Sequence, residues 1–371
     1  MVDQNKLFEQ LNELGLNFFT GVPDSLLNDF CLHLVNNVSD CQHVMVANEG
    51  NAIGVAAGYH MATGEIPVVY MQNSGIGNAA NPLLSLTHQD VYSIPLILLI
   101  GWRGEPGIND HAQHKKQGEL TPVLMTDMDI PYEILDVEET IVEKFAWAVK
   151  VARESKAPVA LIVKKTILTK KEKKQVYPES LLMNREEAIS AVLDVFGGDA
   201  IYLATTGRAT RELHEQITLH GLSHELEFLN VGAMGHLSSI GLGLAIGRPD
   251  KKIVVFDGDA AAVMHMGSLA TNGRYQPKNM IHIVLNNGVN ESVGGQKSSG
   301  QIVDLTACGY ETPISFVETK DALQNAVKTL VECDRLSFVD VHICQGIRKD
   351  MPKLSIEHQL QKEALMNCLK Q

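Results

Sequence analysis

The sequence predicts an α/β protein with two doubly wound domains, each built on a parallel sheet. Unbroken apolar runs of strand length, such as PLILLIG and KIVVF, recur along the chain, as strands buried on both faces require. Segments with helical patterns separate these runs, which is typical of alternating α/β folds. The charged stretch TKKEKKQVYPES has no apolar period, which indicates a linker between two similar halves.

The chain has 371 residues, of which 45% are hydrophobic. This length favours two domains, each large enough for a core of its own. We expect an N-terminal domain at residues 1–168, a linker at 169–184 and a C-terminal domain at 185–371. No third domain fits between the two halves.

In the N-terminal half, each expected strand leads into a polar or glycine-rich segment. The expected elements are an amphipathic helix at residues 1–15, strands at 17–21, 44–47, 67–71, 95–101 and 159–165, and an Ala/Gly-rich helix at 52–64. In the C-terminal half we expect strands at 200–207, 228–232, 252–259, 280–288 and 337–344, and helices from 208, at 234–247, up to about 275, at 320–333 and at the C-terminus.

Net charge and cysteine usage exclude several classes of protein. The formal net charge of −13 argues against nucleic acid or an anionic membrane as a main partner. Six scattered cysteines without a CxxC pair are typical of free thiols in a reducing compartment. The N-terminus lacks a signal-peptide pattern, and no apolar stretch is long enough to cross a bilayer. We therefore expect a soluble, cytoplasmic protein.

Acidic and amide side chains follow two apolar runs of the C-terminal half. IVVFDGD ends in Asp259, and HIVLNN ends in Asn287. Residues 261–285 between them fit one helix and one strand, so neighbouring parallel strands would bring both side chains to one sheet edge. Carboxylate and amide oxygens suit Mg²⁺, which usually completes its shell with phosphate and water. Each half alone is better explained as a turn, with Asp257 serving the first one, and only the two together at this spacing favour a site.

This motif resembles the metal-binding motif of the thiamine diphosphate-dependent enzymes. The resemblance implies that Asp259, Asn287 and the carbonyl of Val289 bind Mg²⁺, which anchors the diphosphate of the cofactor. It also implies two domains of thiamine diphosphate-binding type. The motif departs from the family at Ala260, where glycine is usual, so the backbone there must suit alanine.

The same resemblance requires a glutamate after a strand of the N-terminal domain, and Glu49 occupies that position. Its implied catalytic role is to shift the aminopyrimidine ring of the cofactor to the imino tautomer. A poorly solvated carboxyl group suits this role because burial raises its pKa. Without the second motif, Glu49 would be explained equally well as an acid at a helix N-terminus. The cofactor-binding residues expected are Glu49, Asn73, Thr206, Met234, Gly258, Asp259, Ala260 and Asn287, with Met234 as the apolar wedge beneath the cofactor.

Two further segments are candidates for binding a substrate. TGVPDSLL places Asp24 and Ser25 in a turn after a strand, and residues 102–118 form an expected loop rich in basic side chains. In that loop, Arg103, His111 and His114 are the candidates for contacting an anion. The alternative for each is an ordinary solvated surface residue. Met234, Thr206 and Arg208 likewise have a structural alternative, in the core or at a helix start.

Taken together, GVPDSLL, NEGNAIG, NSGIGNAANPLLSL, LIGWRGEPG and MGHLSSIGLG resemble one branch of the family, the phosphonopyruvate and sulfopyruvate decarboxylases. The resemblance covers nearly the whole chain. It implies decarboxylation of 3-phosphonopyruvate to phosphonoacetaldehyde and CO₂, a step of phosphonate biosynthesis. A fused chain favours phosphonopyruvate, because the halves of sulfopyruvate decarboxylases are often separate subunits. The family also implies a homodimer or larger homo-oligomer with active sites between subunits.

Three alternatives stay open. The same fold can act on sulfopyruvate or another small 2-oxo acid. A non-catalytic subunit of this fold is disfavoured because Glu49, Asp259 and Asn287 are all present. A dinucleotide-binding dehydrogenase is weaker still, since GIGNAAN and GLGLAIG lack the spacing and downstream acid of that fingerprint.

Overall fold

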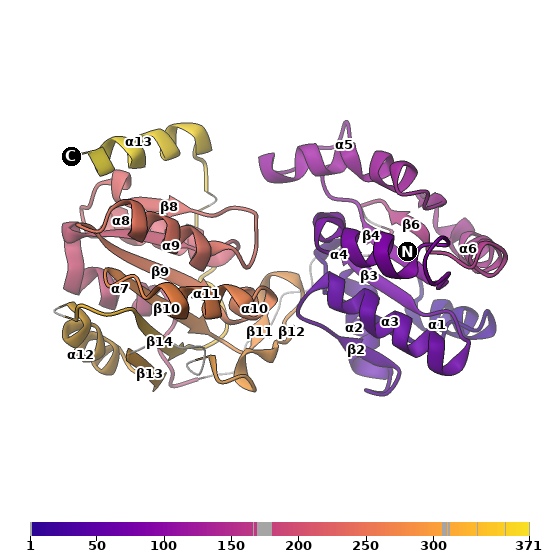
Figure 1. Cartoon of the computed structure of the whole chain (residues 1–371), viewed down its shortest axis with the longest axis horizontal. Helices are drawn as coiled ribbons and strands as arrows, with labels where there is room; N and C mark the ends of the chain where they lie inside the picture. The colour runs from indigo at the N-terminus through magenta and orange to yellow at the C-terminus, as the bar shows by residue number, and fades with distance from the viewer. Residues whose placement is uncertain are drawn as a thin grey trace. The chain divides into compact units, whose positions relative to one another are not determined.

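The computed structural model describes residues 2–165, 167–168, 180–305, 310, 312–331, 333–352 and 354–370. These residues form two compact units, one from each half of the chain (Figure 1). Most of the expected linker, residues 169–179, lies outside the described residues. Each unit is a parallel six-stranded sheet between two layers of helices, which confirms the predicted two-domain α/β class.

The N-terminal unit has the strand order β2-β1-β3-β4-β6-β5, with all neighbours parallel. Its strands are β1 Phe19–Gly21, β2 His43–Met45, β3 Val68–Gln72, β4 Ile97–Gly101, β5 Tyr132–Leu135 and β6 Val159–Val163. Its helices are α1 Gln4–Glu13, α2 Asn28–Asn37, α3 Glu49–Thr63, α4 Ile76–Pro82, α5 Ala112–Asp127 and α6 Ile141–Ser155.

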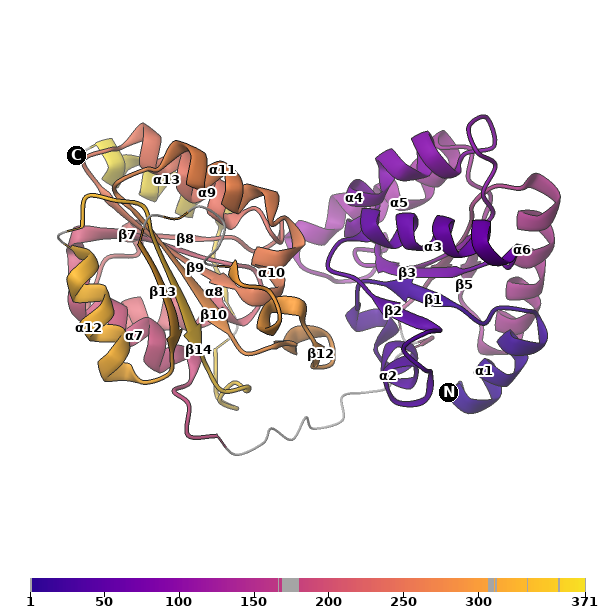
Figure 2. The same cartoon turned by 60° about the horizontal axis from the view of Figure 1, so that its bottom comes forward.

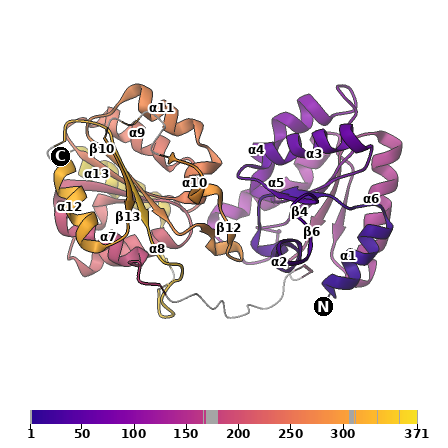
Figure 3. The ribbon, with the colours of Figure 1, turned by 90° about the horizontal axis from the view of Figure 1, so that it is seen from below.

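Two cores lie on the two faces of this sheet. Val68 and Tyr70 of β3 pack with α1, α2 and α6, whereas Val69 and Met71 pack with α3, α4 and α5. Figure 3 shows α3 and α4 on the opposite side of the sheet from α1 and α2. Because successive side chains alternate between two buried faces, the strand reads as a continuous apolar run.

The C-terminal unit has the strand order β13-β14-β10-β9-β7-β8, again parallel throughout. Its strands are β7 Ala200–Ala204, β8 Glu227–Leu229, β9 Lys252–Gly258, β10 Met280–Asn286, β13 Thr312–Val317 and β14 Ser337–His342, and the short strands β11 Val289–Asn290 and β12 Gln296–Lys297 pair with each other. Its helices are α7 Arg185–Phe196, α8 Arg208–Leu219, α9 Leu237–Gly247, α10 Asp259–Met264, α11 Gly267–Tyr275, α12 Lys320–Val331 and α13 His358–Lys370.

Helices α7, α8 and α12 cover one face of this sheet, and α9, α10, α11 and α13 cover the other (Figure 2). The helix expected to run to Tyr275 is interrupted at His265 and Met266, which separate α10 from α11. Numbered within its own unit, each sheet has the order 2-1-3-4-6-5. In such sheets ligands bind beyond the carboxyl ends of the strands, near the point where the strand order reverses.

Among the described residues, none of the helices has both the length and the apolar character needed to cross a bilayer.

Candidate active site

A cluster of charged side chains lies beyond the carboxyl ends of β1 and β4 in the N-terminal unit. The Arg103 guanidinium donates to both carboxylate oxygens of Asp110, at 2.8 Å from Nε and 2.6 Å from Nη2. Its Nη1 lies 3.3 Å from the Ser25 hydroxyl, which joins the two predicted segments. Asp110 also accepts the backbone N–H groups of Gly104 and His111. Although burial opposes the shift, these bonds and the Arg103 charge lower the pKa of Asp110.

Asp24 is the buried acid of this cluster, with 1% of its surface exposed. Its Oδ2 accepts the Leu26 N–H at 3.2 Å, while its Oδ1 has no hydrogen-bond partner among the described residues. Burial raises the pKa of Asp24 to about 6, against the lowering effect of the Arg103 charge. The carboxylate lies against the bare backbone of Gly101, where an added Cβ would come within 2.0 Å of Oδ2. Asp24 can therefore gain or lose a proton near neutral pH.

The expected basic loop at 102–118 ends earlier than predicted, because α5 begins at Ala112. His111 precedes the helix and is exposed, whereas His114 lies in its first turn and is half-buried. Burial, with a smaller contribution from the Arg103 charge, lowers the pKa of His114 to about 4, so its imidazole is neutral at pH 7. The exposed Lys116 pairs with Glu119 on the same helix. The segment therefore directs Arg103 and His114 inward and leaves its other basic groups toward solvent.

Asn73, expected to contact the cofactor, is 3% exposed and is bonded to the start of the Arg103 segment. Its Nδ2 donates to the Arg103 carbonyl at 2.8 Å and to the Thr121 hydroxyl at 2.9 Å. Its Oδ1 accepts the Arg103 N–H at 3.2 Å. These bonds join the end of β3 to the end of β4, so Asn73 fixes the backbone from which the Arg103 side chain extends.

Glu49 is the first residue of α3, and the Asn48 side chain caps this helix by accepting the Gly50 N–H at 2.8 Å. The Glu49 side chain is buried, and its Oε2 accepts a hydrogen bond from Asn78 Nδ2 at 2.7 Å. Burial raises the pKa of Glu49, and the Asn78 bond opposes this shift. A Cβ at Gly75 would lie 2.5 Å from Glu49 Oε1, so glycine is needed for this packing. The environment favours the protonated carboxyl group.

In the C-terminal unit, a cavity of about 90 Å³ lies beyond the ends of β7, β9 and β10. Its lining comprises Arg185, Thr205, Thr206, Gly207, Arg208, Ala209, Met234, Asp257, Gly258, Asp259, Ala260, Ala261, Leu285, Asn287, Val289, Asn290, Glu291 and Ser292. Whole small-molecule sites are several times larger, about 300–1,000 Å³. The cavity therefore suits the polar end of a ligand.

Two oxygen donors predicted from the motif both line this cavity. Asp259 is 3% exposed and accepts a hydrogen bond from the Ser298 hydroxyl. Burial raises its pKa to about 6 despite that bond. Asn287 is 7% exposed, and its Oδ1 accepts the Val289 N–H at 3.1 Å. A carboxylate and an amide oxygen in one polar cavity fit a divalent cation of the Mg²⁺ type.

The preceding residue of each motif pair is tied into the sheet. Asp257 accepts the Gly258 N–H at 3.0 Å and faces His282 at 3.4 Å. Asn286 donates to the Gly300 carbonyl at 3.1 Å and to Asp340 at 3.2 Å. Asn286 and Asn287 are successive residues and therefore point in opposite directions, whereas Asp257 borders the same cavity as Asp259 and is held by its contact with His282.

Alanine fits at position 260. Ala260 is in the first turn of α10 and is not among the described residues with positive φ, so its backbone is one that alanine adopts readily. Because α10 has only six residues, its dipole contributes less to binding an anion than the longer helix expected from the sequence.

Glu291, which the sequence did not single out, connects the cavity to two arginines. Its carboxylate accepts from Arg185 at 2.7 Å and pairs with Arg208 at 2.9 Å. It also accepts the Asn287 Nδ2 at 3.3 Å and the Gly346 N–H. Since Asn287 gives its amide nitrogen to Glu291, its amide oxygen is the end oriented away from that carboxylate. Both guanidinium groups belong to cavity-lining residues, and they favour an anionic ligand.

Met234 lies in a turn before α9, three residues ahead of the helix in which it was expected. The turn is held by Thr206, whose hydroxyl donates to the Val231 carbonyl at 2.9 Å, and by Asn230, which donates to the Ala233 carbonyl at 3.1 Å. Ala233 has a φ of 33°, a left-handed conformation that costs energy for alanine. Thr206 therefore positions the turn that carries Met234.

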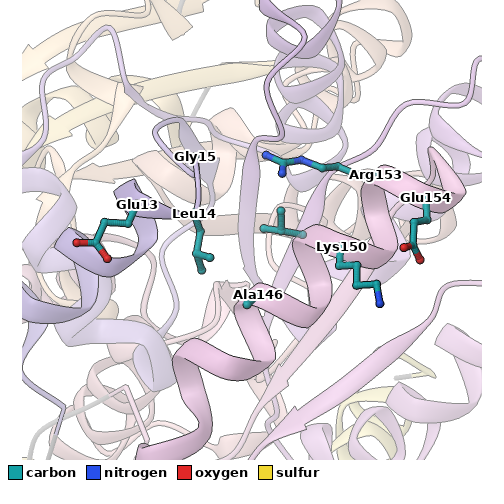
Figure 4. A pocket seen from close by; sticks show the side chains of 8 residues that line it. Glu13, Leu14, Gly15, Ala146, Lys150, Arg153 and Glu154 are labelled. Carbon is teal, nitrogen blue, oxygen red and sulfur yellow. The ribbon is translucent and has the colours of Figure 1, made fainter.

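A second hollow, about 500 Å³, lies between the end of α1 and α6 of the N-terminal unit (Figure 4). Its charged side chains, Glu13, Lys150, Arg153 and Glu154, are all exposed and project in different directions. Because it is open and gathers no buried polar group, we assign the chemistry to the strand ends described above, although this hollow is larger.

Comparison with known proteins identifies the family of the chain. Residues 4–125 match the family model described as the thiamine pyrophosphate enzyme, N-terminal TPP binding domain, and residues 205–341 match the corresponding C-terminal TPP binding domain. Among solved structures, the chain is similar to a putative thiamin diphosphate-dependent enzyme from Mycobacterium smegmatis, with 14% identity, a TM-score of 0.38 and coverage of 92% of this chain and 99% of that one.

The curated relatives include decarboxylases of two related substrates. A phosphonopyruvate decarboxylase of Streptomyces viridochromogenes is 31% identical over 93% of this chain and 89% of its own length. A sulfopyruvate decarboxylase of Methanosarcina acetivorans is 27% identical over 92% of both chains. Sulfopyruvate decarboxylase subunits alpha and beta of Methanococcus maripaludis match at 34% and 30% identity, over 34% and 51% of this chain and 72% and 98% of their own lengths.

Asp24→Asn is predicted to remove a pH dependence of stability. Because burial raises the pKa of Asp24 from 3.8 to about 6, the folded protein binds this proton more tightly than the unfolded chain. The stabilisation from Asp24 is therefore fully present below about pH 4 and is lost as the pH rises through about 6. Relative to the wild type, the free energy of unfolding of Asp24→Asn should rise by about 1–3 kcal/mol between these pH values.

Urea denaturation of both proteins across this pH range measures that difference. Asp127→Asn, which changes an exposed aspartate of the same unit, controls for the loss of one charge. A difference between Asp24→Asn and the wild type that is constant or falls with pH would contradict the assigned shift.

Proposed function

Since this chain belongs to the thiamine pyrophosphate enzymes, as a decarboxylase of the phosphonopyruvate and sulfopyruvate type, we propose that 3-phosphonopyruvate is its substrate. The products are then phosphonoacetaldehyde and CO₂, and the reaction is a step of phosphonate biosynthesis. The observation that carries the proposal is the Arg103–Ser25 pair at the ends of β4 and β1, 3.3 Å apart, beside the buried acid Asp24. Such a pair suits the anionic tail of a small 2-oxo acid.

The C-terminal cavity is assigned to the diphosphate of thiamine diphosphate and to Mg²⁺. Asp259, the Asn287 amide oxygen and the Val289 carbonyl would hold the metal, and Gly258, Ala260 and Thr206 would border the cofactor. Met234 supplies the apolar support beneath it. The bound cofactor provides a carbanion equivalent and an electron sink, which protein side chains lack.

Glu49 is assigned the role of the acid–base group that exchanges a proton with the aminopyrimidine ring of the cofactor. Its Oε2 is already bonded to Asn78, so Oε1 is the atom that would bond the aminopyrimidine ring. Burial raises the pKa of this carboxyl group, which suits a group that exchanges a proton with the cofactor. Asn78 and Gly75 then act by holding the side chain in one orientation.

Substrate contacts are assigned to Arg103, Ser25 and Asp24, with His114 and His111 bordering them. His114 is neutral at pH 7, so it would offer a hydrogen bond and no charge. Arg103 gives two of its five N–H groups to Asp110, so an anionic tail would use the others and would meet the negative charge of that carboxylate. Asp24, with a pKa of about 6, is the group near this cluster that can deliver a proton to a product.

Sulfopyruvate is the second candidate substrate. The sulfopyruvate decarboxylase of M. acetivorans matches 92% of this chain with 92% of its own length. The fusion of both halves in one chain therefore does not distinguish the two substrates, contrary to the expectation from the sequence. Phosphonopyruvate is preferred on the higher identity, 31% over 93% of the chain.

A homodimer is proposed as the smallest active form, with each active site completed by two copies of the chain. The proposal rests on the family resemblance, in which the two cofactor-binding halves meet between subunits; in the relatives named as alpha and beta subunits, each matches only part of this chain. Sedimentation of the loaded protein tests this: a monomer with full turnover would contradict it.

Turnover of phosphonopyruvate, sulfopyruvate and pyruvate, measured side by side as CO₂ release with thiamine diphosphate and Mg²⁺, tests the substrate. We expect the highest kcat/KM with phosphonopyruvate and the lowest with pyruvate, which has no anionic tail for Arg103. A higher kcat/KM with sulfopyruvate would assign that substrate instead. Rates with pyruvate that equal or exceed the others would overturn both assignments.

Glu49→Gln should bind thiamine diphosphate nearly as well as the wild type but lower kcat by about 10²–10⁴-fold, the usual range for loss of an acid–base group. Glutamine keeps the size of the side chain but cannot exchange a proton. Calorimetric titration with the cofactor and steady-state CO₂ release measure the two effects separately. The control is Glu119→Gln, which changes an exposed glutamate of α5 and should leave both cofactor binding and turnover unchanged. Normal turnover by Glu49→Gln would exclude the catalytic role assigned to Glu49.

Asp259→Asn should weaken Mg²⁺ binding by at least about 10–100-fold, the cost seen even when groups behind a metal ligand are changed. Calorimetric titration with Mg²⁺ in the presence of thiamine diphosphate measures this. Asp199→Asn is the control, because it removes the charge of an exposed aspartate of the same unit that does not line the cavity, and it should leave Mg²⁺ affinity unchanged. An unchanged Mg²⁺ affinity of Asp259→Asn would show that Asp259 is not a ligand of the metal.

A further inference from the structure

Two histidines and a buried glutamate converge on the side of the C-terminal unit away from the cavity. Glu227 begins β8, His214 lies in the middle of α8, and His224 begins the short 3₁₀ turn His224–Leu226. The imidazole Nδ1 atoms of His214 and His224 lie 2.6 Å and 2.9 Å from the same oxygen, Glu227 Oε1. The two rings are 4.2 Å apart. Nothing in the proposed decarboxylation uses these residues.

The glutamate of this group is poorly satisfied without a further partner. Glu227 is fully buried, yet its Oε2 has no hydrogen-bond partner within the described part of the chain. Leaving a buried carboxylate oxygen unpaired is costly. The other carboxylate oxygen carries both imidazole contacts. A cation bound between the three side chains would give this buried carboxylate the partner that its second oxygen lacks.

From this geometry we propose that His214, His224 and Glu227 form a binding site for a transition-metal cation of the Zn²⁺ type. One ligand atom from each side chain lies within 4.8 Å of the other two. In a tetrahedral zinc site, bonds of about 2.0 Å place ligand atoms about 3.3 Å apart. Modest side-chain movement therefore converts the hydrogen-bonded group into a three-ligand site.

The donor set favours Zn²⁺ over Mg²⁺, because imidazole nitrogen suits transition metals whereas Mg²⁺ prefers oxygen ligands. The side chains of His214 and His224 are 30% and 44% exposed, which gives an ion an entry path and leaves a position for water. The Nε2 of His224 lies 3.1 Å from the Thr218 hydroxyl. Metal-bound histidines are commonly oriented through the other ring nitrogen in this way.

The position of this proposed zinc site indicates that the ion would stabilise the packing of neighbouring elements. Helix α13 packs against β8 and the 3₁₀ turn that carries His224, and Figure 1 shows α13 beside β8. A bound ion would join α8, this turn and β8, and so fix the surface on which α13 packs. The proposal is independent of the identity of the 2-oxo acid substrate.

Titration of the full-length, untagged protein with Zn²⁺ tests the proposal, after saturation with thiamine diphosphate and Mg²⁺. We expect one zinc-binding event per chain that His214→Asn and His224→Asn weaken at least tenfold. Asparagine places an N–H donor near the position of Nδ1, so these variants keep the hydrogen bond to Glu227 but lose the metal ligand. If His214, His224 and Glu227 only hydrogen-bond to one another and do not bind zinc, both variants should have the same zinc affinity as the wild type.

His220→Asn is the matched control, since His220 ends α8 and pairs with Asp194 outside the group. It should bind Zn²⁺ like the wild type. Co²⁺ absorption provides a second readout, because a tetrahedral site gives intense visible bands that His214→Asn should abolish while CO₂ release is unchanged. The proposal is overturned if the wild type binds no zinc, or if His214→Asn and His224→Asn bind it as the wild type does.

Discussion

Two guanidinium groups, one side-chain amide and one backbone N–H converge on the carboxylate of Glu291. Arg185 also donates to Glu212 at 3.0 and 3.1 Å, so the charges of this buried group are balanced. Removing one partner of such a group leaves an uncompensated buried charge, which typically costs about 3–5 kcal/mol. Through Glu291, the starts of α7 and α8 and the turn after β10 are held in one arrangement. The orientation of the Asn287 amide, and with it the proposed metal site, depends on this arrangement.

The proposed functional residues occupy corresponding positions in the two units. Each sheet has the order 2-1-3-4-6-5, and chemistry-bearing residues follow corresponding strands. Glu49 follows the second strand of the first unit, and Met234 follows the second strand of the other. Arg103 and Asn287 likewise follow the fourth strands. Because all strands are parallel, their carboxyl ends meet at one edge, so loops distant in sequence supply side chains to one site without any change in the sheet. Each unit can therefore carry a different half of the chemistry on one architecture.

Continuous apolar runs made most of the central strands predictable, since burial on both faces leaves little room for polar residues. Edge strand β5 was missed because most of its residues are only half-buried and its sequence, YEIL, contains an acid. The start of helix α5, residues 112–118, was taken for part of a loop and the rest of the helix was not predicted, because its sequence has little amphipathic pattern and contains Pro122. The proposed site residues that stand in local motifs, Asp259, Asn287 and Glu49, were named from the sequence alone.

The residues that orient those groups were not found. Asn78 lies 29 positions from Glu49, and Ser298 lies 39 positions from Asp259. Such partners carry no local pattern, because only the folded sheet decides which loops meet. Asp110 is different: it stands seven residues after Arg103, and an acid so close to an arginine assigned to an anion was a signal available in the sequence.

The Arg103–Asp110 pair bears directly on how the proposed substrate is selected. In the free protein, two of the guanidinium nitrogens already donate to Asp110 and a third faces Ser25. An incoming anion must therefore gain more from the remaining guanidinium N–H groups than it loses through repulsion by the Asp110 carboxylate, in surroundings where charges are only partly screened. A phosphonate, with up to two negative charges, meets this requirement more readily than a singly charged sulfonate, and the methyl group of pyruvate does not meet it. Selection would then come from an internal competitor as well as from contacts to the substrate, which is how discrimination between similar ligands commonly arises. If 3-phosphonopyruvate is the substrate, Asp110 is thus the residue that determines how strongly an anionic tail must interact with Arg103 in order to bind.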